Sequence, residues 1–136
     1  LQSGNRGSIY GDNDLGLEST SKIVVKGRVT LNELSNIQAN TDILVHLCNL
    51  KGGQIPGKIY HYSVTQKPIL FILDGTPTEI EILRKHFLKY NRYFFCDNDV
   101  TSITTCMKEI LATIQRIKEF NIVNDFLPVN VVKQIL

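Results

Sequence analysis

The residues best suited to chemistry in this sequence lie in a glycine-rich stretch, residues 52–58. Gly52, Gly53 and Gly57 lie close together, and Lys58 follows at the start of a predicted helix. Glycines let backbone amides approach a ligand, and the first turn of a helix offers free N–H groups and a partial positive charge. A lysine is unfavourable there unless an anion is bound. The stretch therefore predicts a phosphate or diphosphate site, although an ordinary surface loop with a solvated lysine has the same composition.

This stretch differs from the phosphate-binding loop of nucleoside triphosphatases at two positions. Gly52 and the pair Gly57-Lys58 have the required spacing, but Ile59 stands where that loop needs a metal-binding Ser or Thr. Pro56 also removes one backbone donor. The sequence has neither the Gly-x-Gly-x-x-Gly fingerprint of dinucleotide binding nor the Gly-x-Ser-x-Gly elbow of hydrolases. These two functions are therefore not supported.

Composition and charge narrow the class of protein further. The 136 residues suit one domain, and the net charge of +2 is too small to indicate a nucleic-acid or membrane surface. No apolar run approaches the roughly 20 residues of a membrane span. The odd number of cysteines, Cys48, Cys96 and Cys106, predicts buried reduced thiols in a cytoplasmic protein. The histidines form no metal-ligand pattern with them, so we expect no metal.

Short apolar runs around the glycine-rich stretch predict strands. The predicted strands are Ile23–Lys26, Ile43–Leu47, Ile69–Leu73 and Tyr93–Cys96, with a weaker one at Ser8–Tyr10. Almost wholly apolar runs are typical of strands covered on both faces, as in a parallel sheet.

Helical patterns lie between these strands. Capping boxes at Thr30-Leu-Asn-Glu33 and Thr76-Pro-Thr-Glu79 predict two helix starts. A three-four apolar repeat predicts a long helix over Ser102–Phe120. After Pro128, Val129–Leu136 is a predicted short helix with Asn130 as its cap. The alternation predicts an α/β fold, a Rossmann-like doubly wound parallel sheet flanked by helices, whose ligands lie outside the carboxyl ends of the strands.

Three segments resemble one protein family in the same order and spacing. Residues 54–70, QIPGKIYHYSVTQKPIL, closely resemble the stretch IPGK-(I/L)-(Y/F)-E-Y-L-A-x-G-K-P-I-L in the C-terminal domain of GT-B glycosyltransferases of the retaining family 4, or group 1, kind. Residues 25–34, VKGRVTLNEL, and 40–45, NTDILV, resemble two further segments of that domain. The resemblance covers most of Ile9–Ile117.

The resemblance implies a domain that binds a nucleotide-diphosphate sugar, with no separate cofactor. Gly27-Arg28-Val29 match the loop against the base, and Ile55-Pro56-Gly57-Lys58 match the helix start near the diphosphate. His61 matches a glutamate that binds the ribose hydroxyls. Lys51, Gly52, Gly53 and Gln54 match the loop that faces the donor sugar and phosphates, and Asn49 is a further expected donor-binding residue.

The chain departs from the family at several positions. Relatives carry two glutamates where Gly53 and His61 stand here, and Ser63-Val64 and Gln66 replace Leu-Ala and glycine. A histidine can hydrogen-bond a ribose but cannot offer two anionic oxygens. The ribose is therefore held differently, or donor affinity is weak, or activity is lost. The family's first strand is expected upstream, which leaves residues 1–8 as a flexible start or an expression remnant and 9–136 as the binding domain.

The expected reaction is transfer of a sugar from the donor to an acceptor hydroxyl, with an N-terminal acceptor domain of the same protein as partner. The domain by itself is expected not to catalyse transfer, and no catalytic residue is assigned. We expect no nucleic-acid partner; the full-length enzyme can lie peripherally at a membrane. The main alternative is a non-catalytic nucleotide or sugar-phosphate binding module of the same fold. A receiver-type signalling domain and a nucleotide-sugar epimerase are weaker alternatives, because their carboxylates are not found at the required positions.

Overall fold

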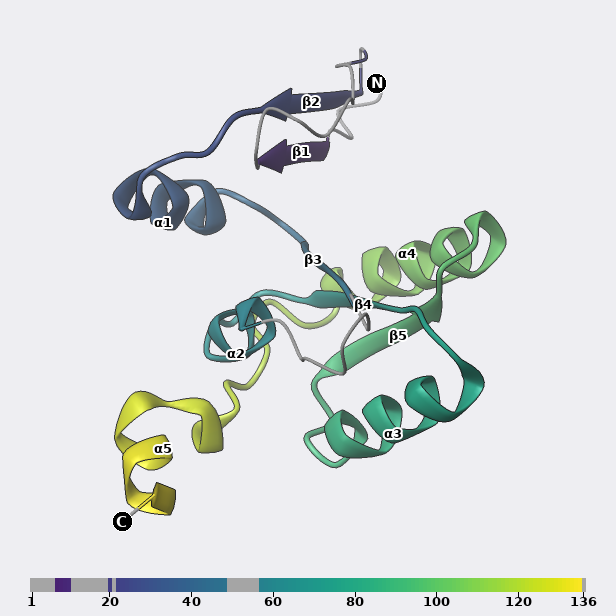
Figure 1. Ribbon diagram of the computed structural model, residues 1–136. Helices are drawn as coiled ribbons and strands as arrows, with labels where there is room; N and C mark the ends of the chain where they lie inside the picture. Colours follow the sequence, from purple (N-terminus) through teal and green to yellow (C-terminus); the bar gives the residue numbers. More distant parts are fainter. Residues whose placement is uncertain (1–6, 11–19, 21, 49–56, 136) are drawn as a thin grey trace. The chain divides into compact units, whose positions relative to one another are not determined.

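The computed structural model describes residues 7–10, 20, 22–48 and 57–135, and the chain divides into two compact units, residues 1–41 and 42–136. The first unit contains the strands β1 (Gly7–Tyr10) and β2 (Ile23–Lys26) and the helix α1 (Leu31–Ala39). The second contains the strands β3 (Leu44–Leu47), β4 (Ile69–Leu73) and β5 (Tyr93–Asp97). Its helices are α2 (Lys58–Ser63), α3 (Pro77–Leu88), α4 (Val100–Ile114) and α5 (Pro128–Ile135), with a 3-10 turn at Asn124–Phe126 (Figure 1).

All strand pairs among the described residues are parallel. In the first unit β1 pairs with β2, and Gly7 lies opposite Ile23. In the second unit the strand order is β3-β4-β5, with Leu44 opposite Ile69 and Ile69 opposite Tyr93. The predicted α/β class, a parallel sheet flanked by helices, is therefore confirmed. The single doubly wound sheet stays a prediction, because the described strands form two sheets.

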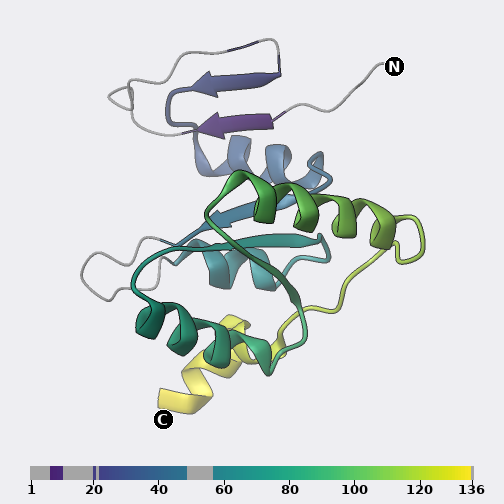
Figure 2. The same ribbon diagram turned by 90° about the vertical axis from the view of Figure 1, so that its right-hand side faces the viewer.

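The core of the second unit forms on both faces of β4, whose five residues are all buried. On one face Ile59 of α2 and Phe87 of α3 pack in a cluster with Phe71 of β4. On the other face Cys106 and Ile110 of α4 pack in a cluster with Leu70 and Ile72 of the same strand. Helices thus cover both faces (Figures 1 and 2), as the continuous apolar run predicts.

Both predicted capping boxes are present. The Thr30 hydroxyl accepts a hydrogen bond from the Glu33 amide at 3.2 Å, and the Glu33 carboxylate accepts one from the Thr30 amide at 3.0 Å. Thr76 and Glu79 make the same reciprocal pair at the start of α3. These bonds satisfy amides that the first helical turn leaves without partners.

The predicted helix Ser102–Phe120 was wrong at both ends. The helix begins at Val100, because the Asp99 side chain caps it through the Ser102 amide at 2.7 Å. It ends at Ile114, after which the chain runs across the amino-terminal side of β4. There the Phe120 amide donates to the Gln66 carbonyl at 3.0 Å. These tertiary bonds replace a further turn of helix, which the apolar spacing alone cannot reveal.

The predicted cap of the last helix was also wrong. The helix α5 begins at Pro128, two residues before Asn130. The Asn130 side chain donates from Nδ2 to the Asn124 carbonyl at 2.6 Å instead of capping an amide. Proline is well tolerated at a first helical position, because it lacks the amide that would have no partner there.

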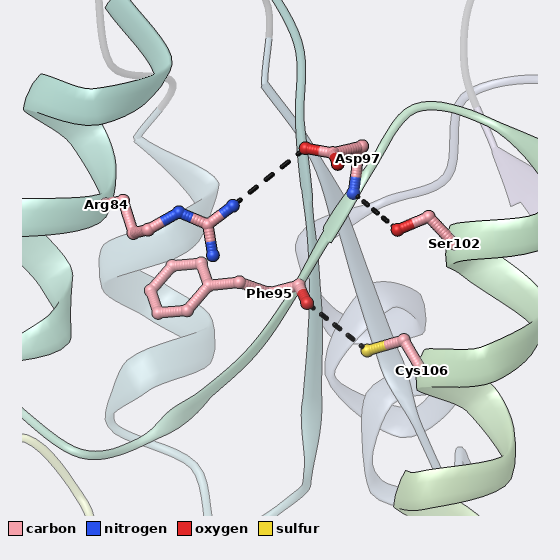
Figure 3. Close-up of polar contacts among 5 residues, drawn as sticks. All are labelled: Arg84, Phe95, Asp97, Ser102 and Cys106. Atoms are coloured by element: carbon pink, nitrogen blue, oxygen red, sulfur yellow. Dashed lines mark hydrogen bonds and ion pairs between the residues drawn. The ribbon is translucent and has the colours of Figure 1, made fainter.

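The two edges of the three-stranded sheet differ. At β5 the first turns of α4 reach the outer edge: the Ser102 hydroxyl accepts from the Asp97 amide at 2.9 Å, and the Cys106 thiol donates to the Phe95 carbonyl at 3.7 Å (Figure 3). At β3 the exposed side chains of Val45 and Leu47 flank an edge with no partner strand among the described residues. The bonds from Ser102 and Cys106 remove backbone groups of β5 from further strand pairing, whereas the backbone of β3 has no such cover among the described residues.

Candidate functional site

The described part of the candidate site centres on the start of α2. Gly57 is its N-cap, Lys58 is its first residue, and no side chain of the described residues caps its amides. Lys58 and His61 are both exposed. The helix start predicted at Lys58 is therefore confirmed, and the lysine lies where the free amides of a first turn are found.

Gly57 adopts ordinary right-handed helical angles, with φ −60° and ψ −21°. A Cβ placed at this glycine would meet no atom of the described residues within 4 Å. Neither its backbone angles nor its packing against the described residues requires a glycine here. A ligand that approaches the backbone closely at this position would require a glycine.

The other predicted site residues divide into two groups. Asn49, Lys51, Gly52, Gly53, Gln54, Ile55 and Pro56 lie outside the described residues. Gly27, Arg28 and Val29 follow β2 in the first unit, where Arg28 is exposed and its neighbours are half-buried. Their role against a base stays a prediction.

The carboxyl ends of β4 and β5 carry a polar pair that was not selected from the sequence. Asp74 follows β4; its carboxylate accepts from the Gly75 amide at 2.9 Å and from the Asn98 side chain at 3.4 Å. Gly75 has φ 129°, a conformation that favours glycine. The position directly after a strand was the available signal, but Asp-Gly before a capping box is equally typical of a plain turn.

Cys48 at the end of β3 lies in the field of the same carboxylate. Its thiol is buried, and burial followed by the charge of Asp74 raises its pKa to about 11. The thiol is therefore protonated at neutral pH and is a poor nucleophile. The prediction of buried, unbridged cysteines is confirmed for all three.

A buried histidine lies beneath this end of the sheet. His46 is 3% exposed, its ring meets Phe71 edge-on at 4.9 Å, and its Nε2 has no hydrogen-bond partner among the described residues. Burial and the positive charge of Lys58 lower its pKa to about 4. The imidazole is thus neutral at pH 7, so Lys58 supplies the positive charge in this region.

Ser63, a departure from the family motif, has a structural explanation. Its hydroxyl is buried at the end of α2, bonds the Ile59 carbonyl at 2.5 Å and lies 2.5 Å from the Tyr93 hydroxyl. Burial raises the pKa of Tyr93 to about 12. The serine therefore ties α2 to β5 through a pair that a leucine could not form.

Two cavities in the second unit lie away from α2. One, of about 480 Å³, is lined by Pro68, Ile114, Phe120 and their neighbours; the other, of about 370 Å³, lies along β5. Neither is lined by Gly57, Lys58 or His61. Within the described ranges no three His, Cys, Asp or Glu side chains gather as metal ligands, and no helix is long and apolar enough to cross a membrane.

Comparisons of the chain with protein-family models, with curated proteins and with solved structures found no match. The α/β class therefore rests on the coordinates, and membership of a glycosyltransferase family stays a prediction from the three motif segments.

Proposed function

We propose that this chain is the donor-binding, C-terminal domain of a GT-B glycosyltransferase of the group 1 kind. In this proposal it binds a nucleotide-diphosphate sugar, and an N-terminal domain of the same protein brings the acceptor hydroxyl. The support comes from the order of the strands, from the start of α2, and from the motif at residues 54–70, which contains that helix start.

The motif at residues 54–70 is the observation that carries the proposal, and the strand neighbours are compatible with it. Doubly wound nucleotide-binding sheets commonly have the order 3-2-1-4-5-6. Without strand 1, that order leaves one parallel pair, 3-2, and one parallel triplet, 4-5-6. The parallel pair β1-β2 and the triplet β3-β4-β5 have the neighbours that this order assigns. The other common doubly wound order, 2-1-3-4-5, contains the same pair and the same triplet, so the strand neighbours support a doubly wound sheet and not one family.

The start of α2 suits a diphosphate. No side chain of the described residues caps it, Lys58 adds a cation, and at Gly57 a Cβ would meet no atom of the described residues within 4 Å. Anions bind favourably where helix amides and a lysine converge. In a transfer reaction the same groups would stabilise the charge that develops on the nucleoside diphosphate leaving group, which is the main catalytic contribution we assign to this domain.

Hydroxyl recognition would then fall to His61 and Asp74. His61 is exposed on α2, in the position of the family's ribose-binding glutamate. Asp74 places an acceptor at the carboxyl end of the neighbouring strand. A carboxylate beside an anion site is suited to sugar or ribose hydroxyls, not to phosphate oxygens.

A non-catalytic nucleotide or sugar-phosphate binding module is the second candidate. The observation that favours it is the imidazole of His61 where the family has a carboxylate, since an imidazole makes at most one hydrogen bond through each nitrogen. The donor domain and the nucleotide-binding form of the second candidate both predict nucleotide binding. They differ in whether the sugar adds to the affinity.

Titration calorimetry with uridine, guanosine and adenosine diphosphates and their sugars tests both. We expect heat with one nucleobase series, and roughly tenfold or more weaker binding in Lys58→Ala, since hydrogen bonds to charged groups contribute about 1.5–3 kcal/mol. Lys133→Ala on α5 is the matched control and should bind as the unchanged chain does.

The outcomes separate the candidates. Tighter binding of the nucleotide-sugar than of the bare diphosphate supports a donor site, whereas equal affinities support the binding module. No heat with any of these compounds would remove the donor site and the nucleotide-binding form of the second candidate.

A further inference from the structure

We propose that the cavity along the outer edge of β5 binds an organic carboxylate. The cavity of about 370 Å³ is lined by residues of α3, β5, α4 and the segment after α4. The lining residues used below are Arg84, Arg92, Phe94, Phe95, Glu109 and Phe120. No step of the proposed nucleotide chemistry uses this cavity, so the two proposals stand separately.

Arg92 is the residue on which the proposal rests. It immediately precedes β5 and is only 5% exposed. Nε donates to the Asn121 carbonyl at 2.7 Å, and Nη2 donates to the Thr65 and Lys67 carbonyls at 2.8 and 2.6 Å. These bonds hold the guanidinium in one orientation, so any further ligand would meet a preorganised donor.

One side of this guanidinium is unsatisfied. Nη1 is buried without a hydrogen-bond acceptor among the described residues, and no acidic side chain there forms an ion pair with Arg92. Buried charges in proteins are normally paired, and a buried donor without an acceptor costs free energy. An oxyanion at this cavity would supply the opposite charge, and it would supply the acceptor on displacing the side chains that cover Nη1.

The rest of the lining indicates what the anion should carry. The rings of Phe94 and Phe120 lie 5.9 Å apart, and the Arg92 guanidinium lies 5.4 Å from the Phe120 ring centre. Aromatic walls bury apolar groups well. One free guanidinium nitrogen suits a singly charged carboxylate with an apolar or aromatic body, whereas a phosphate dianion favours several converging donors.

Two charged side chains on the cavity wall should tune the affinity in opposite directions. Arg84 extends from α3 over the Phe95 ring, 5.6 Å from its centre, and its guanidinium approaches Asp97 at 3.9 Å (Figure 3). Glu109 lines the cavity from α4. The arginine attracts an incoming carboxylate and the glutamate repels it. Both are outside the core, so changing them should not impair folding.

The test uses benzoate as the probe and benzamide as its neutral counterpart, followed by NMR on the whole chain. We expect benzoate to shift resonances of Arg92, Phe94 and Phe120 in a saturable manner and benzamide to leave them unchanged. A short peptide ending in phenylalanine, with a free or an amidated C-terminus, identifies the source. Tighter binding of the free-ended peptide than of benzoate supports a peptide terminus as ligand, and tighter binding of benzoate supports a small acid.

Variants make the test independent of Arg92 itself, whose replacement could prevent folding. Arg84→Gln should weaken benzoate binding and Glu109→Gln should strengthen it, each by about two- to fivefold, the range of exposed charge pairs. Lys108→Gln, next to Glu109 but outside the lining, should have no effect. Absence of benzoate binding, equal binding of benzamide, or no response to Glu109→Gln would each overturn the proposal.

Discussion

His46 and Ser63 are buried polar residues whose surroundings set their behaviour. His46 has its pKa lowered to about 4 by burial and by Lys58, and Ser63 pairs its hydroxyl with Tyr93. Neither role follows from the sequence, because a histidine within a strand and a serine within a helix occur equally well on a surface. Both roles depend on which side chains the tertiary fold brings next to His46 and Ser63.

We expect the stability of the chain to fall as the pH drops from 6.5 towards 4. The unfolded histidine titrates near 6.5, while in the folded chain the pKa of His46 is about 4, so the unfolded state binds more protons in this window. Stability is therefore full above pH 6.5 and declines below it, by up to roughly 3 kcal/mol at the acid end. Urea unfolding across this range measures the effect.

The difference in unfolding free energy between the chain and His46→Leu isolates this contribution. The unfolding free energy of the chain minus that of His46→Leu should decrease as the pH is lowered, because the variant lacks the titrating group. His61→Gln removes an exposed imidazole and should keep the pH dependence of the parent. An unchanged pH dependence in His46→Leu would contradict the assignment.

The hydroxyl pair of Ser63 and Tyr93 should show a measurable coupling. In a double-mutant cycle of Ser63→Ala and Tyr93→Phe, we expect a coupling free energy of about 1 kcal/mol, the usual net contribution of one hydrogen bond. Urea unfolding of the four proteins supplies the values. Tyr90→Phe in place of Tyr93→Phe should give no coupling to Ser63→Ala; equal coupling for both tyrosines would argue against the pair.

At the level of elements, the sequence predicted helix starts better than helix ends. The capping boxes at Thr30 and Thr76 are local, since all their partners lie within three residues. The end of α4 depends instead on distant groups, the Gln66 carbonyl and the Arg92 guanidinium, which bind the chain after Ile114. Ile117, which lies within the predicted helix Ser102–Phe120, is exposed for this reason.

Thr76→Ala should destabilise the chain by about 1 kcal/mol through loss of the helix cap. The hydroxyl accepts from the Glu79 amide at 3.3 Å, and alanine offers no acceptor. Thr78→Ala is the control, because Thr78 lies in the first turn of the same helix and its side chain makes no capping bond. This change should alter stability by less than about 0.5 kcal/mol. Urea denaturation followed by circular dichroism compares the two, and equal losses would mean that the cap contributes nothing.

For the whole molecule, the strand order along the chain was predicted but the division into two units was not. Periodicity shows where strands and helices lie, yet it does not show which strands pair. The candidate site shares this limit. Lys58 was correctly placed at a helix start, whereas Asp74 and Arg92 become candidates only through contacts that fold-level packing creates.

The two units should differ in protection from hydrogen exchange. None of the residues in the first unit whose side chains are described is buried, while β4 is buried throughout. Amides of β4 and β5 should therefore exchange with free energies near that of global unfolding, and those of β1 and β2 should exchange much faster. Exchange measured by NMR or mass spectrometry decides this; equal protection in both sheets would contradict it.

The hydrogen bonds that Ser102 and Cys106 make to the outer edge of β5 have a consequence for synthesis on the ribosome. β5 ends at Asp97, so the strand leaves the exit tunnel before the residues that cover its edge. Until α4 has emerged and folded, the nascent sheet exposes unpaired backbone on this side, and exposed edges are where chains pair wrongly. A pause in translation while β5 is outside the tunnel and α4 is still inside it would prolong that exposure, whereas a pause after α4 has emerged would not.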